Sequence, residues 1–174
     1  MRVCTPDKEN WSKLIHLMQY ITGTRTLALI LSANGSGILK WWVDASFAVY
    51  HNMQGNSRGG LSLGCGFPIV RSTKQKLNTK ISTDIEIVGF DDFMPAIFWT
   101  RYFIAFQGYN VKDNCQHQDN KSYDLMGKNG KTLIRPRTKH INIRYFFITH
   151  RVKKVEFSLL WCSTGDMIGD YMTK

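Results

Sequence analysis

The feature that most constrains this sequence is a run of large apolar residues that contains a single acid. The run reads LKWWVDASFAVY over residues 39–50, and its acid is Asp44. The β-branched and aromatic residues of the run predict a strand. An unpaired carboxylate is costly to bury, so an acid in the middle of such a strand needs a partner of opposite charge. A buried salt bridge to a lysine or arginine and a bound metal ion are the two interpretations of Asp44.

The composition is that of a globular protein with a strong positive charge. The chain has 174 residues, of which 43% are hydrophobic, so one domain with a sizeable core is expected. A formal net charge of +10 favours a polyanionic partner, nucleic acid first and an acidic membrane surface second. A basic soluble protein without such a partner is the alternative, because net charge reports solubility as well as binding.

The cysteines and the N-terminal residues predict where the protein works. The four cysteines, at positions 4, 65, 115 and 162, form no CxxC pair and no Cys/His ligand spacing, which argues against a zinc site. Scattered single cysteines are typical of a reducing compartment. The first residues lack a secretory apolar core, and no apolar run reaches membrane-spanning length. We therefore expect a soluble intracellular protein of the cytoplasm or nucleus, without a signal peptide or transmembrane segment.

Hydrophobic patterns along the chain predict alternating strands and helices. The predicted strands cover residues 26–32, 38–49, 61–66, 68–75, 115–118 and 155–162. The predicted helices cover residues 6–22, 82–107, 120–128, 135–154 and 164–174. The glycine-rich segment 54–60 is predicted to be a loop, and Pro95 is predicted to break the long helix near Phe93. Strands joined by crossover helices indicate a layered α/β domain with a partly parallel sheet.

Four acids fall at strand ends or helix starts, and each has a structural alternative to a catalytic role. Glu86 follows Thr83 with the spacing of a helix capping box, although its helical phase turns it toward the sheet. Asp119 has the position of a helix cap, and Asp170 that of a solvated surface acid. Asp44 has the weakest such alternative.

The same four acids, taken together, indicate a metal site. Carboxylates that converge repel one another and raise each other's pKa unless a cation lies among them. Hard oxygen ligands suit Mg²⁺, and paired divalent ions are a known device for phosphodiester hydrolysis. Spacing alone leaves both the salt bridge and the metal ion open for Asp44.

Five stretches of the sequence resemble the ribonuclease H domain at the C-terminal end of the copia-type retrotransposon polyprotein. They follow the family's order and are WVDASFA (42–48), STKQKLNTKISTDIE (72–86), QDNKS (118–122), RTKHINIRYFF (137–147) and TGDMIGDYMTK (164–174). Residues 1–34 are similar to the segment that joins the reverse transcriptase to that domain. The resemblance therefore implies two parts, a connecting segment over 1–34 and a ribonuclease H-like domain over 35–174.

This resemblance implies an α/β, ribonuclease H-like fold with a mixed five-stranded sheet flanked by helices. It implies endonucleolytic hydrolysis of the RNA strand of an RNA–DNA hybrid, leaving a 5′-phosphate and a 3′-hydroxyl. Two Mg²⁺ ions, which Mn²⁺ can replace, are the implied cofactors, with no small-molecule cofactor and no membrane. A separately supplied reverse transcriptase domain is a further implied partner. The family's catalytic, metal-binding acids correspond to Asp44, Glu86, Asp119 and Asp170.

The family also implies a role for each acid. Asp44 would bridge the two ions, and Glu86 and Asp119 would complete the site for the ion beside the leaving group. Asp170 would help to hold the ion that delivers the hydroxide.

The chain departs from the family pattern in two places. Where the family commonly reads SSTEAE, this chain reads ISTDIE, so Ile81 and Asp84 differ while Glu86 stays. The chain ends at Lys174, about one helical turn after Asp170, which makes Asp170 the least secure ligand. An inactive retroelement remnant that only binds nucleic acid is therefore the alternative function. An integrase-like strand-transfer domain is less favoured, because the second acid is a glutamate and no HHCC segment is present.

Two basic clusters, before the long helix and on the basic helix, are candidates for phosphate binding without sequence readout. Their alternative is a solvated charged face. The predicted nucleic-acid-binding residues are Lys74, Lys76, Lys80, Arg137, Lys139, His140 and Arg144. Three polar residues, Gln75, Asn78 and Asn120, are candidates for contacts to 2′-hydroxyl groups. The tryptophans at 41, 42, 99 and 161 are predicted to lie in the core, because their segments are apolar.

Overall fold

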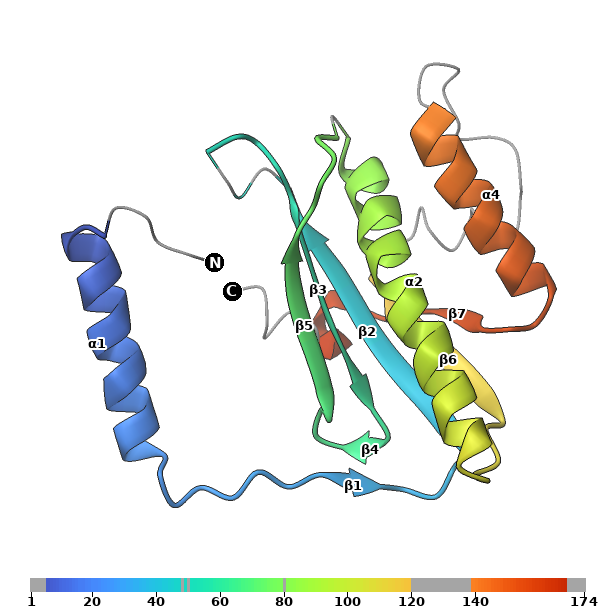
Figure 1. Cartoon of the computed structure of the whole chain (residues 1–174), viewed down its shortest axis with the longest axis horizontal. Coiled ribbons are helices and arrows are strands. Elements are labelled where there is room, and N and C mark those ends of the chain that lie inside the picture. The colour runs from blue at the N-terminus through green and yellow to red at the C-terminus, as the bar shows by residue number, and fades with distance from the viewer. Residues whose placement is uncertain (1–5, 48, 50, 80, 120–138, 169–174) are drawn as a thin grey trace. The chain divides into compact units, whose positions relative to one another are not determined.

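The structure is a computed structural model, which describes residues 6–47, 49, 51–79, 81–119 and 139–168 (Figure 1). Contacts divide the chain into two compact units, Met1–Ile30 and Leu31–Lys174. This division falls a few residues before the predicted boundary between positions 34 and 35. That residues 1–34 derive from a connecting segment stays a prediction. Within the described residues, every helix is too short or too polar to span a membrane.

The described part of the first unit, residues 6–30, contains the helix α1 (Lys8–Gly23), close to the predicted range of 6–22. It begins where the side chain of Asp7 accepts a hydrogen bond from the backbone N–H of Asn10 at 2.7 Å. Such an N-terminal cap satisfies a backbone donor that has no partner within the helix. The apolar side chains of α1, such as Trp11 and Met18, are exposed.

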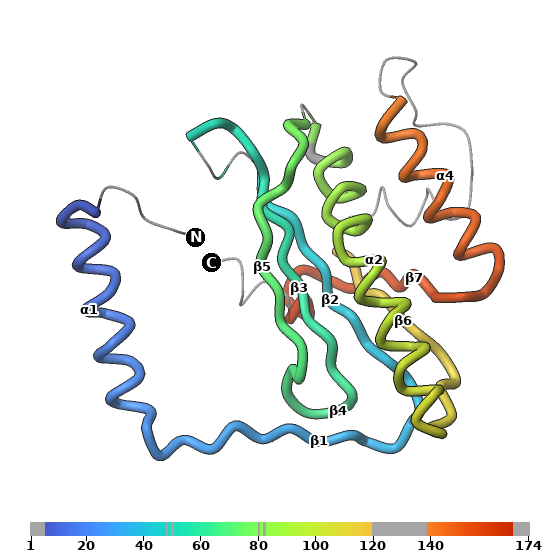
Figure 2. The backbone as a smooth tube through the Cα atoms, in the orientation of Figure 1, coloured from blue at the N-terminus to red at the C-terminus, as the bar shows by residue number. Residues whose placement is uncertain are grey.

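The second unit is built on a mixed five-stranded sheet (Figures 1 and 2). In spatial order its strands are β5 (Ile69–Lys74), β3 (Asn56–Ser62), β2 (Ile38–Ser46), β6 (Asp113–Gln118) and β7 (Ser158–Trp161). Strand β3 pairs antiparallel with β2 and β5, whereas β6 pairs parallel with β2 and β7. Two short strands, β1 (Ser32–Ala33) and β4 (Gly64–Cys65), form a separate pair. The predicted five-stranded α/β architecture is confirmed.

Two helices, α2 (Ser82–Phe106) and α4 (Lys139–Lys153), belong to the same layer, with α2 packed on β2 and β3 and α4 packed against α2 (Figure 1). Side chains alternate between the two faces of a strand, so Trp41 and Val43 of β2 point to one face together. They join Phe90, Phe93 and Ile97 of α2 in one buried cluster. The core therefore lies between the sheet and α2.

One strand prediction and one loop prediction are wrong. Residues 27–31 form no strand, because their apolar side chains are exposed and only Ser32–Ala33 finds a partner, in β4. The predicted loop over 54–60 is instead largely strand β3, which begins at Asn56. The glycines of this segment serve close packing here: a Cβ at Gly59 would lie 2.5 Å from the carbonyl oxygen of Trp42 on the neighbouring strand.

The helix α2 continues through Pro95, so the predicted break near Phe93 is wrong. A proline inside a helix removes one N–H donor and crowds the carbonyl four residues earlier. Pro95 lies on the exposed side of α2, where water can satisfy the carbonyl of Asp91 that loses its donor. Tertiary packing on the opposite side of α2 holds the helix together across this position.

Only two of the four tryptophans lie in the core as predicted. Trp41 and Trp42 of β2 are buried. Trp99 is 60% exposed and Trp161 is 46% exposed, so the prediction is wrong for both. Trp99 lies on the outer face of α2 and stacks on Phe103 with ring centroids 4.9 Å apart.

Some predicted elements fall partly or wholly outside the described residues. The predicted helix over 120–128 lies outside them, and the basic helix is described from Lys139 onward. The predicted last helix over 164–174 is described only at its start, where η1 (Thr164–Asp166) is a 3₁₀ turn.

Candidate active site

The candidate site lies where β2 and β6 end and α2 begins. Trp42 of β2 is opposite His117 of β6 in a parallel pair, and their rings stack with centroids 4.7 Å apart. Continuing this register by two residues brings Asp44 level with Asp119, which directly follows β6. The carboxyl ends of neighbouring parallel strands are where open α/β sheets place their ligands.

Glu86 reaches this edge from the first turns of α2. The helix begins at Ser82 with Ile81 as its N-cap, and the side chain of Ile81 makes no capping hydrogen bond. The capping-box interpretation, which needs Thr83 as the cap, is therefore wrong. The carboxylate of Glu86 instead accepts a hydrogen bond of 2.5 Å from Nε2 of Gln118, the last residue of β6.

Three of the four predicted acids share one electrostatic environment. Burial, and then the neighbouring carboxylate of Asp44, raise the pKa of Glu86 to about 8; the carboxylate of Asp119 adds to this, and the hydrogen bond from Gln118 opposes it. At neutral pH and without a cation, the folded protein therefore favours a protonated Glu86. Residues on two strands and one helix are thus close enough to influence one another's charge.

The sheet also offers Asp44 a basic neighbour. Asp44 of β2 is directly opposite Arg58 of β3 in the antiparallel pair. Directly opposed residues of such a pair point to the same face, with Cβ atoms about 5 Å apart. The salt-bridge interpretation of Asp44 therefore has Arg58 as its natural partner, and the metal interpretation stays open beside it.

Asp119 is held at the sheet edge by the last residue of β7 and by the segment that follows it. The indole Nε1 of Trp161 donates to the carbonyl oxygen of Asp119 at 3.0 Å, and the hydroxyl of Thr164 lies 3.5 Å from its carboxylate. The backbone N–H of Cys162 donates to the carbonyl of Gln118 at 2.9 Å. Sequence analysis missed these partners because they are more than 40 positions away and have no spacing signal.

Two curated proteins are similar to the chain along almost its whole length. It is 28% identical over 170 residues to a retrovirus-related Pol polyprotein from transposon TNT 1-94 of Nicotiana tabacum. It is 23% identical over 171 residues to one from transposon RE2 of Arabidopsis thaliana. Each alignment covers 97% of this chain, which spans only 13% and 12% of the respective relative. No protein-family model matches the chain. The predicted resemblance to transposon polyproteins is confirmed.

Solved structures decide the fold. LC11-RNase H1, isolated from compost by a metagenomic approach, superposes with a TM-score of 0.57 at 9% identity, covering 78% of this chain and 92% of that one. A structure of LC11-RNase H1 in complex with an RNA/DNA hybrid gives a TM-score of 0.53 at 9% identity over 76% and 91% of the two chains. The fold is ribonuclease H-like. At this identity the likeness concerns the fold, and the roles of individual residues stay predictions.

The donor chemistry at this edge of the ribonuclease H-like sheet suits a hard divalent cation. Asp44, Glu86 and Asp119 offer carboxylate oxygens. Burial is the largest cause of the raised pKa of Glu86, and the repulsion from Asp44 and Asp119 adds to it; a cation would relieve that repulsion. In the part of the chain that the structure describes, no three His, Cys, Asp or Glu side chains stand close enough together to hold a metal. Asp170 lies outside that part. The oxygen donors thus suit a divalent cation by their chemistry, but the described side chains do not form a closed ligand set, and the carboxylate of Glu86 is hydrogen-bonded to Gln118.

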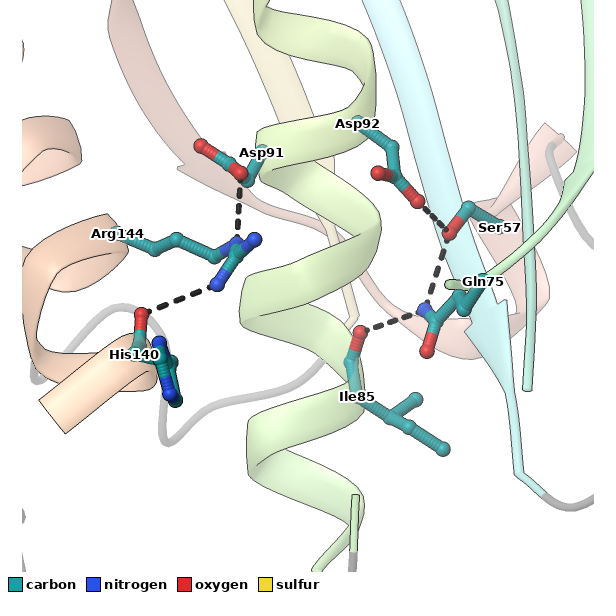
Figure 3. A network of polar contacts seen from close by, with 7 residues as sticks. All are labelled: Ser57, Gln75, Ile85, Asp91, Asp92, His140 and Arg144. Atoms are coloured by element: carbon teal, nitrogen blue, oxygen red, sulfur yellow. Dashed lines mark hydrogen bonds and ion pairs between the residues drawn. The ribbon is translucent and has the colours of Figure 1, made fainter. Parts of the chain in front are cut away.

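The predicted nucleic-acid-binding residues of the ribonuclease H-like unit differ in exposure. The exposed residues are Lys74 at the end of β5, Lys76 just after it, and Lys139 and His140 at the start of α4. Arg144 is partly buried, and its Nε donates to a carboxylate oxygen of Asp91 at 2.7 Å (Figure 3). This ion pair gives Arg144 a structural role between α2 and α4. The two other predicted residues, Lys80 and Arg137, lie outside the described residues.

The polar residues predicted to contact 2′-hydroxyl groups also differ in exposure. Gln75 is 1% exposed, so its prediction as a substrate contact is wrong. Asn78 is exposed and donates to the carbonyl of Asn52 at 3.2 Å. Asn120 lies outside the described residues.

Proposed function

We propose that the chain is the ribonuclease H domain of a transposon Pol polyprotein and hydrolyses the RNA strand of an RNA–DNA hybrid. The observation that carries this proposal is the shared electrostatic environment of Asp44, Glu86 and Asp119 at one edge of a ribonuclease H-like sheet. The structural neighbour LC11-RNase H1, solved in complex with an RNA/DNA hybrid, supports this choice of substrate. The relatives' polyprotein origin supports a reverse transcriptase domain as a partner.

Asp44, Glu86, Asp119 and Asp170 are the residues that would hold the metal ions. Two Mg²⁺ ions, or Mn²⁺ in their place, would supply an activated water as nucleophile and would stabilise the leaving oxygen. Gln118 orients the carboxylate of Glu86, while Trp161 and Thr164 keep Asp119 at the end of β6.

The exposed basic residues would bind the phosphate backbone of the hybrid. Lys74 and Lys76 precede α2, and Lys139 and His140 begin α4, so two surface segments carry positive charge. Such contacts position a duplex without reading its sequence, and the 2′-hydroxyl groups and A-like shape of a hybrid would mark the RNA strand. The cysteines at 65, 115 and 162 are free, in keeping with work inside the cell.

Cleavage of a labelled RNA–DNA hybrid tests the proposal. We expect cleavage with Mg²⁺, none with EDTA, and none from Asp44→Asn or Glu86→Gln. Glu9→Gln on α1 is the matched control, because Glu9 is an exposed acid whose partner is Lys13 at 2.6 Å. Its activity should equal that of the wild type. Unchanged cleavage by the Asp44 and Glu86 variants, with all chains equally folded, would show that the proposed site is wrong.

A second candidate function is nucleic-acid binding without catalysis. The observation that favours it is that the described carboxylates do not close into a ready ligand set. It predicts hybrid binding that weakens steeply with salt and no cleavage at any Mg²⁺ concentration. The same labelled hybrid, followed by filter binding and by gel, distinguishes the two functions.

A further inference from the structure

A buried amide side chain ties the start of α2 to the sheet. Gln75 directly follows β5, and its Nε2 donates one hydrogen bond to Oγ of Ser57 and one to the carbonyl oxygen of Ile85, both at 3.0 Å (Figure 3). Ser57 lies on β3 and is buried, and Ile85 is the residue before Glu86. The side chain of Gln75 thus links two strands to the backbone of the first turns of α2.

The directions of these hydrogen bonds determine how the amide of Gln75 is oriented. The hydroxyl of Ser57 donates its single hydrogen to a carboxylate oxygen of Asp92 at 2.9 Å (Figure 3). Its oxygen is therefore left to accept from Gln75. Both hydrogens of the Gln75 Nε2 are then used, one by Ser57 and one by Ile85. A side chain that lacks an NH₂ group cannot make this pair of contacts.

The network holds α2 at two points on the same side. Ile85 and Asp92 are seven residues apart, which is about two helical turns, so both face the sheet. Gly89 lies between them, and a Cβ there would be 2.9 Å from Cβ of Ala45, the residue after Asp44. Helix and sheet therefore approach closely next to the candidate site.

Directional contacts at two points restrict the rotation and sliding of α2 on the sheet, which apolar packing restricts only weakly. Hydrophobic contact has no preferred direction, so it resists separation of a helix from a sheet more than it resists rotation or sliding. Hydrogen bonds at Ile85 and Asp92 define both the rotation of α2 and its position along its axis. At the start of the helix, the N-cap Ile81 makes no capping side-chain hydrogen bond that could do this instead.

We propose that Gln75 is a positioning residue, whose buried amide sets the place of the first turns of α2 and thereby holds Glu86 beside Asp44. The inference rests on the proposed function, because the place of Glu86 matters for chemistry only if Glu86 is a ligand. Gln75 itself is buried and does not reach the substrate, so it acts through the backbone of Ile85.

The test compares Gln75→Met with a matched control on the same helix. Methionine has nearly the shape of glutamine but no donor. Asn114→Leu is the control: Asn114 is 0% exposed, and its Nδ2 donates to the carbonyl of Ile97 at 3.3 Å, farther along α2. Both variants remove a buried hydrogen bond from a side-chain amide to the backbone of α2, but only Gln75→Met removes one next to Glu86. Ser57→Ala is a milder variant that leaves the bond to Ile85 and should give an intermediate effect.

Three measurements are made on each variant: Mg²⁺ affinity by calorimetry, kcat and KM for hybrid cleavage, and amide hydrogen exchange of residues 86–90. We expect Gln75→Met to lose roughly tenfold to a hundredfold in Mg²⁺ affinity, as is typical when a partner of a metal ligand is removed. Its kcat should fall while KM stays, and exchange at 86–90 should speed up. Asn114→Leu should keep the wild-type Mg²⁺ affinity and kcat.

The outcomes separate this inference from the proposed function. Equal losses in both variants, or no loss in Gln75→Met, would overturn the positioning role. A wild-type chain that neither binds Mg²⁺ nor cuts the hybrid would overturn the proposed function instead. In that case the exchange data decide: faster exchange at 86–90 in Gln75→Met than in Asn114→Leu supports the positioning role, and equal exchange rejects it.

Discussion

The two halves of α2 are held in different ways. In the first half, residues 82–94, apolar packing is joined by directional bonds from Gln75, Ser57 and Gln118 to the helix. In the second half, residues 95–106, the outer face carries exposed aromatic side chains, with Phe106 at 88% exposure. The first half contains Glu86. The second half also receives a hydrogen bond, from Asn114 of β6 to the carbonyl of Ile97. The comparison teaches that bonds from the sheet to the helix are more numerous in the half that contains Glu86.

The largest expected effect contrasts the aromatic residues of the two halves. Phe90→Ala should cost about 3–5 kcal/mol of unfolding free energy, because Phe90 is fully buried and packs on Phe157 with ring centroids 5.4 Å apart. Phe106→Ala should leave the free energy of unfolding nearly unchanged. Urea unfolding followed by circular dichroism measures both. Similar losses in the two variants would remove the contrast between the halves.

Pro95 lies at the junction of the two halves, where we expect a stabilising substitution. Pro95→Ala restores an N–H donor to the carbonyl of Asp91 in an exposed part of the helix. Proline is about 3 kcal/mol less favourable than alanine inside a helix, so the gain in unfolding free energy should approach that value at most. Thermal unfolding measures it. A loss of stability would mean that the proline shapes the helix in a way that packing requires.

Gly89 tests the close approach of the first half to the sheet. Gly89→Ala improves helix propensity by up to about 1 kcal/mol but overpacks against Ala45, which typically costs about 1–3 kcal/mol. We expect a net loss of unfolding free energy in urea titrations. Gly23→Ala in α1, where a Cβ would meet nothing within 4 Å, should show no loss. A gain at position 89 would show that helix and sheet can separate there without cost.

The smallest expected effect is a dependence of the unfolding free energy on pH, caused by Asp92. Burial raises the pKa of Asp92 above its ordinary value, while the hydrogen bond from Ser57 opposes this. A carboxyl with a raised folded-state pKa binds its proton more tightly in the folded chain. Its contribution to stability is therefore present at low pH and is lost as pH rises through the folded pKa.

Asp92→Asn removes this dependence and keeps an oxygen that can accept from Ser57. The unfolding free energy of the wild type, relative to Asp92→Asn, should fall as pH rises above the ordinary carboxyl range. Urea titrations at a series of pH values measure the difference. A difference that stays constant with pH would contradict the raised pKa.

Much of the sheet could be predicted because its signals are local. The β-branched and aromatic residues around Asp44 predict a strand, and the structure confirms it as β2. The sequence could not predict that residues 27–31 are exposed and form no strand, because an apolar run forms a strand only where a partner strand is available. Segment 56–62 shows the converse: its glycines suggest a loop, but its neighbours β2 and β5 make it a strand.

In the candidate site, too, one feature could be predicted from local sequence and another depended on distant residues. The helical phase of Glu86 predicts that it faces the sheet, and its contact with Gln118 agrees with this. Nothing in the sequence indicates that Gln75 is buried rather than available to a substrate, because its role depends on Ser57 and Ile85 across separations of 18 and 10 residues.

The sequence by itself determined most of the helices, the strand around Asp44, the face on which Glu86 lies and the resemblance to transposon polyproteins, because periodicity and motif spacing are properties of neighbouring residues. Only the tertiary structure decided that Arg58 stands opposite Asp44, that Gln75 ties β3 to α2, and that Trp99 is exposed. Strand register and helix placement result from contacts between distant segments. They arise when the chain closes on itself, which is why one acid in an apolar strand acquires its neighbours only in the folded protein.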